Sequence, residues 1–524
     1  METDPFCLKK NKRREILILL FCLLVGLALR IHNFDKKSLW IDEVHTFTDS
    51  REGIKGQIKY FKEKPQDLLH PPLFFILTNL FHPFPKPERD LRIIPLIFGT
   101  LSIPMIYFLA KLFSPHIAIP CTLSLVFMTY HISFSQDGRP YSLLIFLAMA
   151  SLYFFLKHLT TFKKRDLFLT ALFYAISFYS SYAAIPFIAL SQILWFYRMD
   201  GNGKRPYFYS FLILNGVTFL ICLPWIMFIA INYKGQPFMD PFFTQELGSF
   251  WNILTGILND WLPSAPLMAA SIILIVLFPF FSNNRRNAFV ILAAIFVPIV
   301  VLFSFSKVIS FKHYFSSRYV ISFLPLFFIT LYLSLDAIEF RFHKLRRFFR
   351  LKLLFLIIFI ASNMVILPLY YLSEKQDFKG LVSYLEGQLR DGDKIYVRSI
   401  AYIPGMLHYF GVRPESRHHD IPVWWNESEG AVESRINLVS QNKKITIIFS
   451  SSCCAQFTAD GSRLWMVVGK PAVKEFKETF PCVLKGYFDG SFCNFRRFPE
   501  DASMFLFLWD PSSPEEKGID MQVE

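Results

Sequence analysis

The chain has 524 residues, of which 53% are hydrophobic and 18% charged, with 61 phenylalanines and a formal net charge of +14. Disordered chains are polar and poor in aromatic residues, so this composition excludes intrinsic disorder. The 22 glycines and 31 prolines are too few for a collagen-like or low-complexity chain. A single soluble domain of this length rarely carries so much apolar surface with so few charges. The composition therefore predicts a polytopic membrane protein.

The charges are unevenly distributed along the chain. Residues 1–372 contain 37 Lys and Arg against 20 Asp and Glu, whereas residues 373–524 contain 18 against 21. The long apolar runs end near Leu372, so we expect a membrane domain over 1–372 and a second domain over 373–524. The basic residues lie in short loops between apolar runs, where membrane topology accounts for them. No nucleic acid partner is therefore expected.

Eleven apolar segments approach the roughly 20 residues that a helix needs to cross the bilayer core. The expected spans are 16–32, 92–113, 116–134, 140–158, 166–181, 183–198, 207–231, 265–282, 287–305, 318–337 and 351–372. Short basic clusters lie before the first span, at 163–165, at 204–205, at 285–286 and at 341–352. Because successive loops alternate between the two sides of the membrane, all of these clusters fall on the same side. Basic loops favour the cytoplasm, so we expect a cytoplasmic N-terminus and an extracytoplasmic C-terminal domain.

The C-terminal segment has the alternation of a small α/β domain. Strands are expected over 394–400, 445–452, 463–469 and 503–509, and helices over 377–389, 431–441 and 471–480. Four of the eight cysteines lie in this segment, at 453, 454, 482 and 493. An oxidising compartment would allow a disulfide among them, but the sequence does not give the pairing.

The first outward loop, 33–91, is long enough to suggest a functional role. It opens with Trp40, Asp42, Glu43 and His45, followed by the apolar run 70–81, which is short and suits an interfacial helix. On a helix, Asp42, His45, Thr46 and Asp49 share one face, whereas Glu43 points about 100° away from Asp42. One carboxylate can then act as general base while the other holds a neighbouring group. The alternative is that both acids only favour the positive end of a helix.

Two further outward segments carry charges at span ends. Asp137 and Arg139 lie between two spans, and an arginine there can bind phosphate oxygens or merely contact headgroups. Lys312, His313 and Arg318 stand among aromatic residues at the start of another span. This cluster suits an anionic lipid phosphate, and the alternative is ordinary interfacial anchoring.

Together these motifs resemble the GT-C type integral membrane glycosyltransferases, most closely the bacterial dolichyl-phosphate-mannose–protein mannosyltransferase-like branch that includes lipopolysaccharide-core and lipid A sugar transferases. The resemblance rests on Leu-Trp-Ile-Asp-Glu at 39–43, His-Pro-Pro-Leu-Phe-Phe at 70–75 and Leu-Arg-Ile-Ile-Pro-Leu-Ile-Phe-Gly at 91–99. It continues through 130–141 and Ser-Arg-Tyr at 317–319. It covers roughly residues 10–340. We therefore expect a membrane helix bundle of GT-C type, mainly α, with an outward catalytic loop over 33–91 and a C-terminal α/β domain.

The resemblance implies sugar transfer from a polyprenyl-phosphate donor to a glycan, lipid or protein acceptor on the outer face of the membrane, with inversion. By motif position the resemblance implies that Asp42 is the general base, that Glu43 supports either Asp42 or the acceptor, and that Asp137 completes the catalytic group. Asp137 stands in a Ser-Gln-Asp-Gly-Arg sequence where the family usually has Ser-Gln-Glu-Ala-Arg. Candidates for binding the donor phosphate are Arg139, Arg318 and Lys312, and candidates for substrate binding are His45, His70, Tyr141 and Tyr319.

Several alternatives remain at this stage. No cofactor is firmly expected, although a divalent metal held by Asp42, His45 or Asp137 stays open. A second hypothesis is a transporter or flippase of lipid-linked sugars. Transporters often have internal repeats and charges near the middle of the membrane, whereas here no repeat is evident and the charges lie at the ends of spans. An oligosaccharide ligase-type transferase is a third. The expected location is a bacterial inner membrane, where membrane lipids surround the chain, and the alternative is the endoplasmic reticulum.

Overall fold

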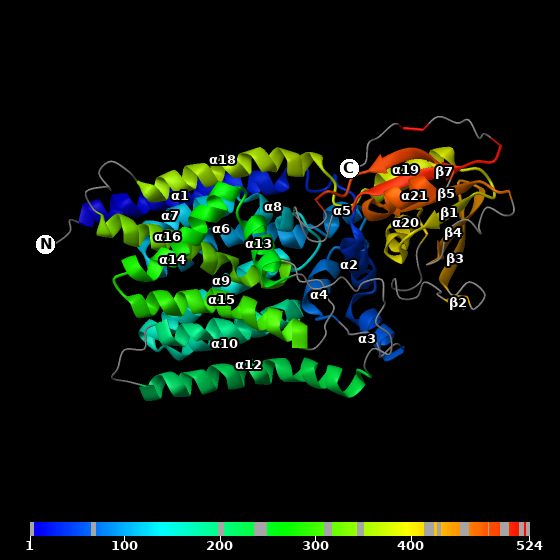
Figure 1. Ribbon diagram of the computed structural model, residues 1–524. Helices are drawn as coiled ribbons and strands as arrows, with labels where there is room; N and C mark the ends of the chain where they lie inside the picture. Colours follow the sequence, from blue (N-terminus) through cyan, green and yellow to red (C-terminus); the bar gives the residue numbers. More distant parts are fainter. Residues whose placement is uncertain are drawn as a thin grey trace. The chain divides into compact units, whose positions relative to one another are not determined.

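The computed structural model describes residues 5–63, 70–197, 204–234, 249–308, 317–342, 350–412, 424–426, 431–450, 461–479, 481–492, 502–512 and 518–519. The chain divides into two compact units, each built from three separate segments. We call Met1–Phe34, Glu52–His82 and Arg92–Leu369 the helical unit, and Asp35–Arg51, Pro83–Leu91 and Tyr370–Glu524 the sheet unit (Figure 1). Each is described by itself.

Over its described residues, the helical unit is a bundle of α-helices with three short 3₁₀ segments. Its elements are α1 (Pro5–Ile31), α3 (Gly53–Glu63), α4 (Leu73–Asn79), α6 (Ile93–Phe113), α7 (Pro115–Phe127), α8 (Thr129–Ser135), α9 (Tyr141–Thr161), α10 (Lys164–Ser180), η1 (Tyr182–Ala184), α11 (Ile185–Leu190), η2 (Ser191–Tyr197), α12 (Lys204–Asn232), α13 (Phe250–Trp261), α14 (Ala265–Phe281), α15 (Arg285–Val308), η4 (Ser317–Phe323), α16 (Leu324–Arg341) and α18 (Leu351–Leu372). The mainly helical architecture expected from the sequence is confirmed.

Several of these helices have the length and composition of membrane spans. In the part of the chain that the structure describes, six are long and apolar enough, and two bent pairs raise the total to eight if each pair is one span. The bent pairs are α7 with α8, at 60°, and α13 with α14, at 110°. The chain is therefore a multi-pass membrane protein, while the count of eleven spans stays a prediction.

The bend between α7 and α8 is held by polar side chains from α1 and α18. Met128 leaves the helical conformation, so carbonyl groups at the end of α7 lose their partners within the helix. The buried guanidinium of Arg30 donates to the carbonyls of Leu125 and Val126, at 2.9 and 3.3 Å, and contacts Nδ1 of His131 at 2.8 Å. The amide oxygen of Asn363 accepts from the backbone N–H of Thr129 at 2.8 Å. These contacts fix where α8 begins.

The sheet unit is built around one mixed sheet with the strand order β2-β3-β4-β1-β5-β7-β6. Its strands are β1 (Lys394–Val397), β2 (Trp424–Asn426), β3 (Ala431–Ser440), β4 (Lys443–Ser450), β5 (Leu464–Gly469), β6 (Val483–Phe488) and β7 (Met504–Trp509). The central strand β1 pairs in parallel with β4 and β5, whereas the remaining neighbours are antiparallel. This arrangement confirms the expected C-terminal α/β domain.

Helices cover both faces of the sheet. The helical elements of this unit are α2 (Ile41–Arg51), α5 (Pro87–Asp90), α19 (Phe378–Gln388), η5 (Ile400–Tyr402), α20 (Ile403–Tyr409), η8 (Lys470–Ala472) and α21 (Val473–Thr479). Helices α19 and α20 pack through Phe378 and Met406 on one face, and α21 packs through Val473 and Phe476 on the other. Three layers of this kind bury the near-continuous apolar runs of β1 and β5 on both sides.

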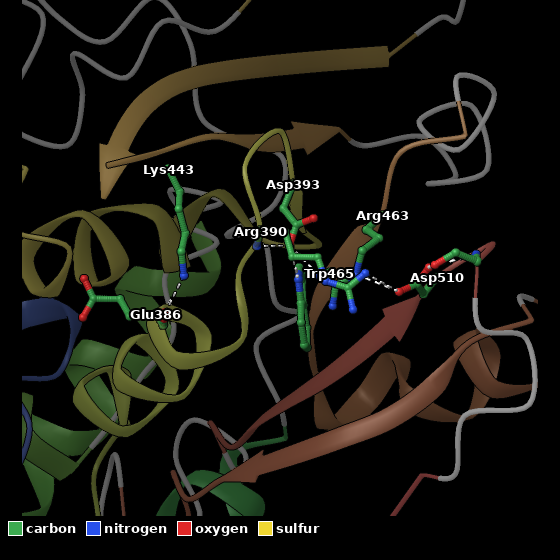
Figure 2. A network of polar contacts seen from close by, with 8 residues as sticks. Glu386, Arg390, Asp393, Lys443, Arg463, Trp465 and Asp510 are labelled. Carbon is green, nitrogen blue, oxygen red and sulfur yellow. Dashed lines mark hydrogen bonds and ion pairs between the residues drawn. The ribbon is translucent and has the colours of Figure 1, made fainter. Parts of the chain in front are cut away.

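A network of ion pairs holds one end of the sheet together (Figure 2). The Asp393 carboxylate, just before β1, accepts from the Arg463 guanidinium at 3.1 Å and from the Trp465 indole at 3.0 Å. Nε of Arg463 also lies 2.9 Å from the Asp510 carboxylate, which follows β7. Burial alone would raise the pKa of Asp510. Hydrogen bonds from Ser512 and the positive charges of Arg463 and Arg390 outweigh that effect and lower it. The network thus joins the ends of three strands.

The sequence-based elements of this unit are mostly confirmed, with one error. The segment 431–441, expected to be a helix, is the strand β3, which pairs antiparallel with β4. Its apolar residues fit both repeats, since Val432, Ile436 and Val439 have helical spacing while Ile436 and Leu438 alternate. Pairing with β4 decides between them. The thiol of Cys482 is free, and the other three cysteines of this domain lie outside the described residues.

Candidate functional site

The acidic pair of the first outward loop lies at the start of α2. Trp40 precedes the helix, and its carbonyl accepts from the N–H groups of Glu43 and Val44 at 2.9 and 3.0 Å. The Glu43 carboxylate accepts in return from the Trp40 N–H at 3.4 Å, which is the reciprocal half of a capping box. Glu43 is fully buried. Its carboxylate therefore closes the first turn of the helix.

Asp42 is placed differently from its neighbour. It is partly exposed, as is His45 one turn further on, whereas Glu43 and Thr46 are buried. The Thr46 hydroxyl donates to the Asp42 carbonyl at 3.0 Å, within the helix backbone pattern. Adjacent positions on a helix point about 100° apart, and the two carboxylates accordingly have different surroundings. Asp42 is the acid of the pair whose side chain remains accessible.

Residues from the segment that follows α18 and from α20 hold the segment that leads into α2. The Leu39 N–H donates to the Tyr409 hydroxyl at 2.7 Å, and the Ile41 N–H donates to the Gln376 amide oxygen at 2.9 Å. The Lys37 ammonium group donates to the carbonyl of Ser373 at 2.7 Å. The bonds from Leu39 and Ile41 satisfy backbone donors at the start of the helix, where no partner within the helix exists. Helix α2 is thus a fixed part of the sheet unit.

In the helical unit, the turn after α8 carries Asp137 and Arg139. Asp137 is buried, at 1% exposure, and its carbonyl accepts from the Arg139 N–H at 2.6 Å. The preceding Gln136 amide donates to the carbonyls of Arg30 and His32, at 2.8 and 2.7 Å, at the end of α1. Arg139 is partly exposed. The turn is therefore fixed to α1 while its arginine stays accessible.

A chain of three buried polar side chains joins two of the predicted motifs. The Tyr130 hydroxyl lies 2.8 Å from the Ser317 hydroxyl, which donates to the Asp260 carboxylate at 2.6 Å. All three residues are buried. Ser317 opens the Ser-Arg-Tyr motif, and Tyr130 opens the segment that includes Asp137 and Arg139. The fold thus connects these two motifs, although 187 positions separate Tyr130 from Ser317.

Asp260 was not predicted from the sequence as a site residue. It is the carboxylate that ends the chain of hydrogen bonds, and it comes from α13, just before the 110° bend to α14. The available signal was an aspartate inside an apolar stretch ahead of a predicted span, which is costly to bury without a partner. No spacing pattern linked it to the other motifs.

The remaining predicted residues are distributed as follows. Tyr141 is buried and its ring lies 5.0 Å from that of Phe134, as in ordinary aromatic packing. The Arg318 guanidinium lies 5.5 Å from the ring of Tyr319, which is 36% exposed. His70 is exposed ahead of α4. Lys312 lies outside the described residues, so its predicted role in binding the donor phosphate rests on the sequence alone.

Gly99, at the end of the 91–99 motif, lies at a close contact between two helices. A Cβ atom added at this position would lie 2.1 Å from the Ser135 hydroxyl and 2.6 Å from the Ser135 Cβ. Helices α6 and α8 therefore approach so closely that only glycine fits between them. This close approach places the 136–139 turn, which follows Ser135 directly.

The predicted site residues come from both units. Asp42, Glu43 and His45 belong to the sheet unit, and Asp137, Arg139 and Arg318 belong to the helical unit. Among the residues that the structure describes, no group of three or more His, Cys, Asp or Glu side chains forms a metal site. The Glu43 carboxylate closes the first turn of α2, and the Asp260 carboxylate accepts from the Ser317 hydroxyl.

The sequence and the fold were compared with known proteins. The profile of the dolichyl-phosphate-mannose-protein mannosyltransferase family matches residues 69–228. A search of curated sequences found no match. The crystal structure of ArnT from Cupriavidus metallidurans in the apo state covers 95% of this chain and 98% of its own, with a TM-score of 0.53 and 12% identity.

A second crystal structure, of ArnT from Cupriavidus metallidurans bound to undecaprenyl phosphate, gives a TM-score of 0.52 at 13% identity. It covers 94% of this chain and 97% of its own. At such low identity the likeness concerns the fold, which extends over both units. The chain is thus a multi-pass membrane protein of the GT-C fold, similar over residues 69–228 to the dolichyl-phosphate-mannose-protein mannosyltransferases.

Proposed function

We propose that the chain is a membrane glycosyltransferase that moves a sugar from a polyprenyl phosphate to a glycan, lipid or protein acceptor. The family match over residues 69–228 and the fold shared with ArnT support this class of reaction. One of the two ArnT structures contains undecaprenyl phosphate, a polyprenyl phosphate, and this supports a donor of that kind. Transfer takes place on the outer face of the membrane, in keeping with the basic loops predicted for the cytoplasmic side.

The observation that carries the proposal is the different placement of the two acids on α2. Glu43 is buried and caps the helix, so it is not available to take a proton from a substrate. Asp42, one position earlier, remains partly exposed on a helix that backbone and side-chain bonds hold in place. A fixed, accessible carboxylate is what a general base requires. Asp42 is therefore assigned as the base, and Glu43 as the residue that positions it.

The reaction is a single displacement at C1 of the sugar. The Asp42 carboxylate accepts the proton of the acceptor hydroxyl as its oxygen bonds to C1. The bond between C1 and the phosphate oxygen breaks, and polyprenyl phosphate leaves with both electrons of that bond. One displacement on a carbon centre inverts the anomeric configuration. The leaving phosphate gains negative charge in the transition state, which a positioned guanidinium stabilises.

Arg139 and Arg318 are the residues proposed to bind that phosphate. Both are partly exposed, and the network of Tyr130, Ser317 and Asp260 connects their two motifs within the helical unit. Arginine suits a phosphate because its planar guanidinium can donate two parallel hydrogen bonds. Asp137 is buried beside Arg139 in the chain and is proposed to orient the turn rather than to touch the sugar.

The decisive experiment replaces Asp42 by Asn in the full-length chain and measures transfer of a radiolabelled sugar from its polyprenyl phosphate in membranes. Loss of a general base lowers rates by about 10²–10⁴-fold, and we expect a decrease of that size. Asp35→Asn is a matched control, since Asp35 is exposed and lies in the same loop. Transfer by Asp42→Asn at the wild-type rate would remove the assignment. Movement of the lipid-linked sugar without any covalent product would identify a transporter instead.

A further inference from the structure

Helix α3 has two unlike faces. Gln57 and Phe61, one helical turn apart, are buried against the helical unit. The three lysines of the helix are all exposed, namely Lys55, Lys59 and Lys62. Their spacing of four and three residues places them in one row along the opposite face. Against these three lysines the helix contains a single acidic residue, Glu63, at its last position.

The buried face of α3 packs against α10 and α12. Phe61 belongs to a cluster with Phe178, Cys222 and Trp225, and its ring lies 5.8 Å from that of Phe228. Figure 1 shows α3 beside one end of α12. Because Phe61 has no exposed surface, this contact fixes the position of α3 in the helical unit.

The contact also places Phe61 near one end of the candidate span in α12. The candidate span in α12 runs from Tyr207 to Asn232, so Phe228 lies about 6 Å from the end of that span. An aromatic pair with polar tips lies about one helical turn further in, where the Trp225 indole donates to the Tyr182 hydroxyl at 3.1 Å. Tryptophan and tyrosine gather where the bilayer core meets the headgroups.

Helix α12, against which α3 packs, has an apolar outer surface. Helix α12 exposes large apolar side chains near this end, including Met227 and Ile231, which is 73% exposed. A membrane span with such a surface faces hydrocarbon rather than other helices. A helix that lies at headgroup level beside it, with an apolar face inward and lysines outward, has the pattern of an interfacial helix.

We propose that Lys55, Lys59 and Lys62 form a binding surface for the headgroups of anionic phospholipids. Lysine ammonium groups at the headgroup level are attracted to phosphate, and their long aliphatic stems let the charge reach it. The row spans two helical turns, or about 10 Å, enough to meet more than one headgroup. The proposal rests on the membrane placement of the helical unit and is independent of the transferase assignment.

The test uses the full-length chain purified in a neutral detergent and measures, by native mass spectrometry, how much phosphatidylglycerol it retains relative to phosphatidylethanolamine. Each lysine near an anionic surface is worth about fivefold in binding, so three give up to about a hundredfold. We expect K55Q/K59Q/K62Q to lose most of the preference for phosphatidylglycerol, and K55R/K59R/K62R to retain it. The preference should also fall as salt is raised.

The matched control is K379Q/K444Q/K474Q, which removes the same charge from exposed positions in the sheet unit. We expect this variant to bind phosphatidylglycerol as the wild type does. Equal retention by K55Q/K59Q/K62Q and the wild type would overturn the proposal, and so would an equal loss in the control. If K55Q/K59Q/K62Q does not fold, two other measurements test the proposal. They are the salt dependence of phosphatidylglycerol binding by the wild type and the amount of phosphatidylglycerol that K55R/K59R/K62R retains. A wild type with no salt-sensitive preference contradicts the proposal. Transferase activity is measured in parallel, because its absence would leave the lipid result unchanged.

Discussion

Ser317 occupies the middle of a buried chain of hydrogen bonds, between the Tyr130 hydroxyl and the Asp260 carboxylate. Its neighbour Arg318 is proposed to bind phosphate, so the hydroxyl holds the start of that motif in place. Ser317→Ala removes one hydrogen bond from each of these two buried side chains, and a hydrogen bond to a charged group contributes about 1.5–3 kcal/mol. We expect a lower thermal transition of the purified protein and a reduced rate of sugar transfer.

The control for this residue is Thr255→Ala on α13, the helix that carries Asp260. Thr255 is exposed and its hydroxyl bonds only within that helix turn, to the Trp251 carbonyl at 2.8 Å and the Asn252 carbonyl at 3.1 Å, among the contacts described. Loss of the Thr255 hydroxyl should leave both the thermal transition and the rate of sugar transfer close to those of the wild type. If Ser317→Ala unfolds at the wild-type temperature, the hydroxyl is not part of what holds this motif.

At the residue scale, local motifs predicted candidate residues but not their partners. The helical repeat correctly separated Asp42 from Glu43, because it depends only on neighbouring positions. The helical repeat did not predict that Glu43 is buried, because burial depends on how α2 packs against the rest of the protein. Asp260 escaped prediction because the hydrogen bond to Ser317 joins positions 57 residues apart. Such a contact is set by how helices pack, and no local spacing encodes it.

At the scale of elements, α20 packs against α2 through a titratable ring. The imidazole of His408 lies 5.0 Å from the ring of Phe47 on α2. Burial lowers the pKa of His408 from its usual 6.5, although the Glu88 carboxylate partly opposes this. The folded state therefore binds the proton less readily than the unfolded chain, and stability present above pH 6.5 is lost as the pH falls through the folded pKa.

We expect the thermal transition of the full chain to fall on acidification below about pH 6.5, with a loss of at most about 1.4 kcal/mol per pH unit from this group. His408→Gln cannot titrate and should show a weaker decline over the same range. His116→Gln, at an exposed position, should follow the wild type. An unchanged pH profile in His408→Gln would assign the decline to other groups.

The elements themselves illustrate what a single sequence can specify. Strands β1, β5 and β7 were predicted within a few residues because each is a short apolar run rich in branched and aromatic residues. Strand β3 was mistaken for a helix because its apolar residues fit both repeats. Strands β2 and β6 were not predicted at all. Their place at the two edges of the sheet depends on pairing with distant strands, which local propensity does not determine.

At the scale of the whole molecule, the sheet unit is assembled from three separate parts of the chain, and α2 belongs to it. The Tyr409 hydroxyl accepts from the Leu39 N–H at 2.7 Å and donates to the Glu88 carboxylate at 3.3 Å, so one side chain joins all three parts. We expect Tyr409→Phe to loosen α2, which would show as faster proteolysis near residues 39–51 and as slower sugar transfer.

Tyr487→Phe provides the comparison, since it removes a hydroxyl from the same unit at an exposed position, where the hydroxyl contacts Asp489 and Ser503. It should change neither the proteolysis of α2 nor the rate of transfer. Equal effects of the two substitutions would mean that loss of any tyrosine hydroxyl in this unit loosens α2. If neither substitution has an effect, the remaining bonds to the backbone hold α2 in place without the Tyr409 hydroxyl.

The discontinuity of the sheet unit also sets an order of events during biosynthesis. Segment 35–51 leaves the ribosome early, whereas Gln376 and Tyr409, which bind its backbone, are made only after more than three hundred further residues. Until then segment 35–51 lacks its contacts with Gln376 and Tyr409, while all the membrane helices are inserted. The enzyme as proposed would therefore become competent only when translation is nearly complete, and a ribosome that stalls before residue 370 would leave the acidic segment without a place to dock.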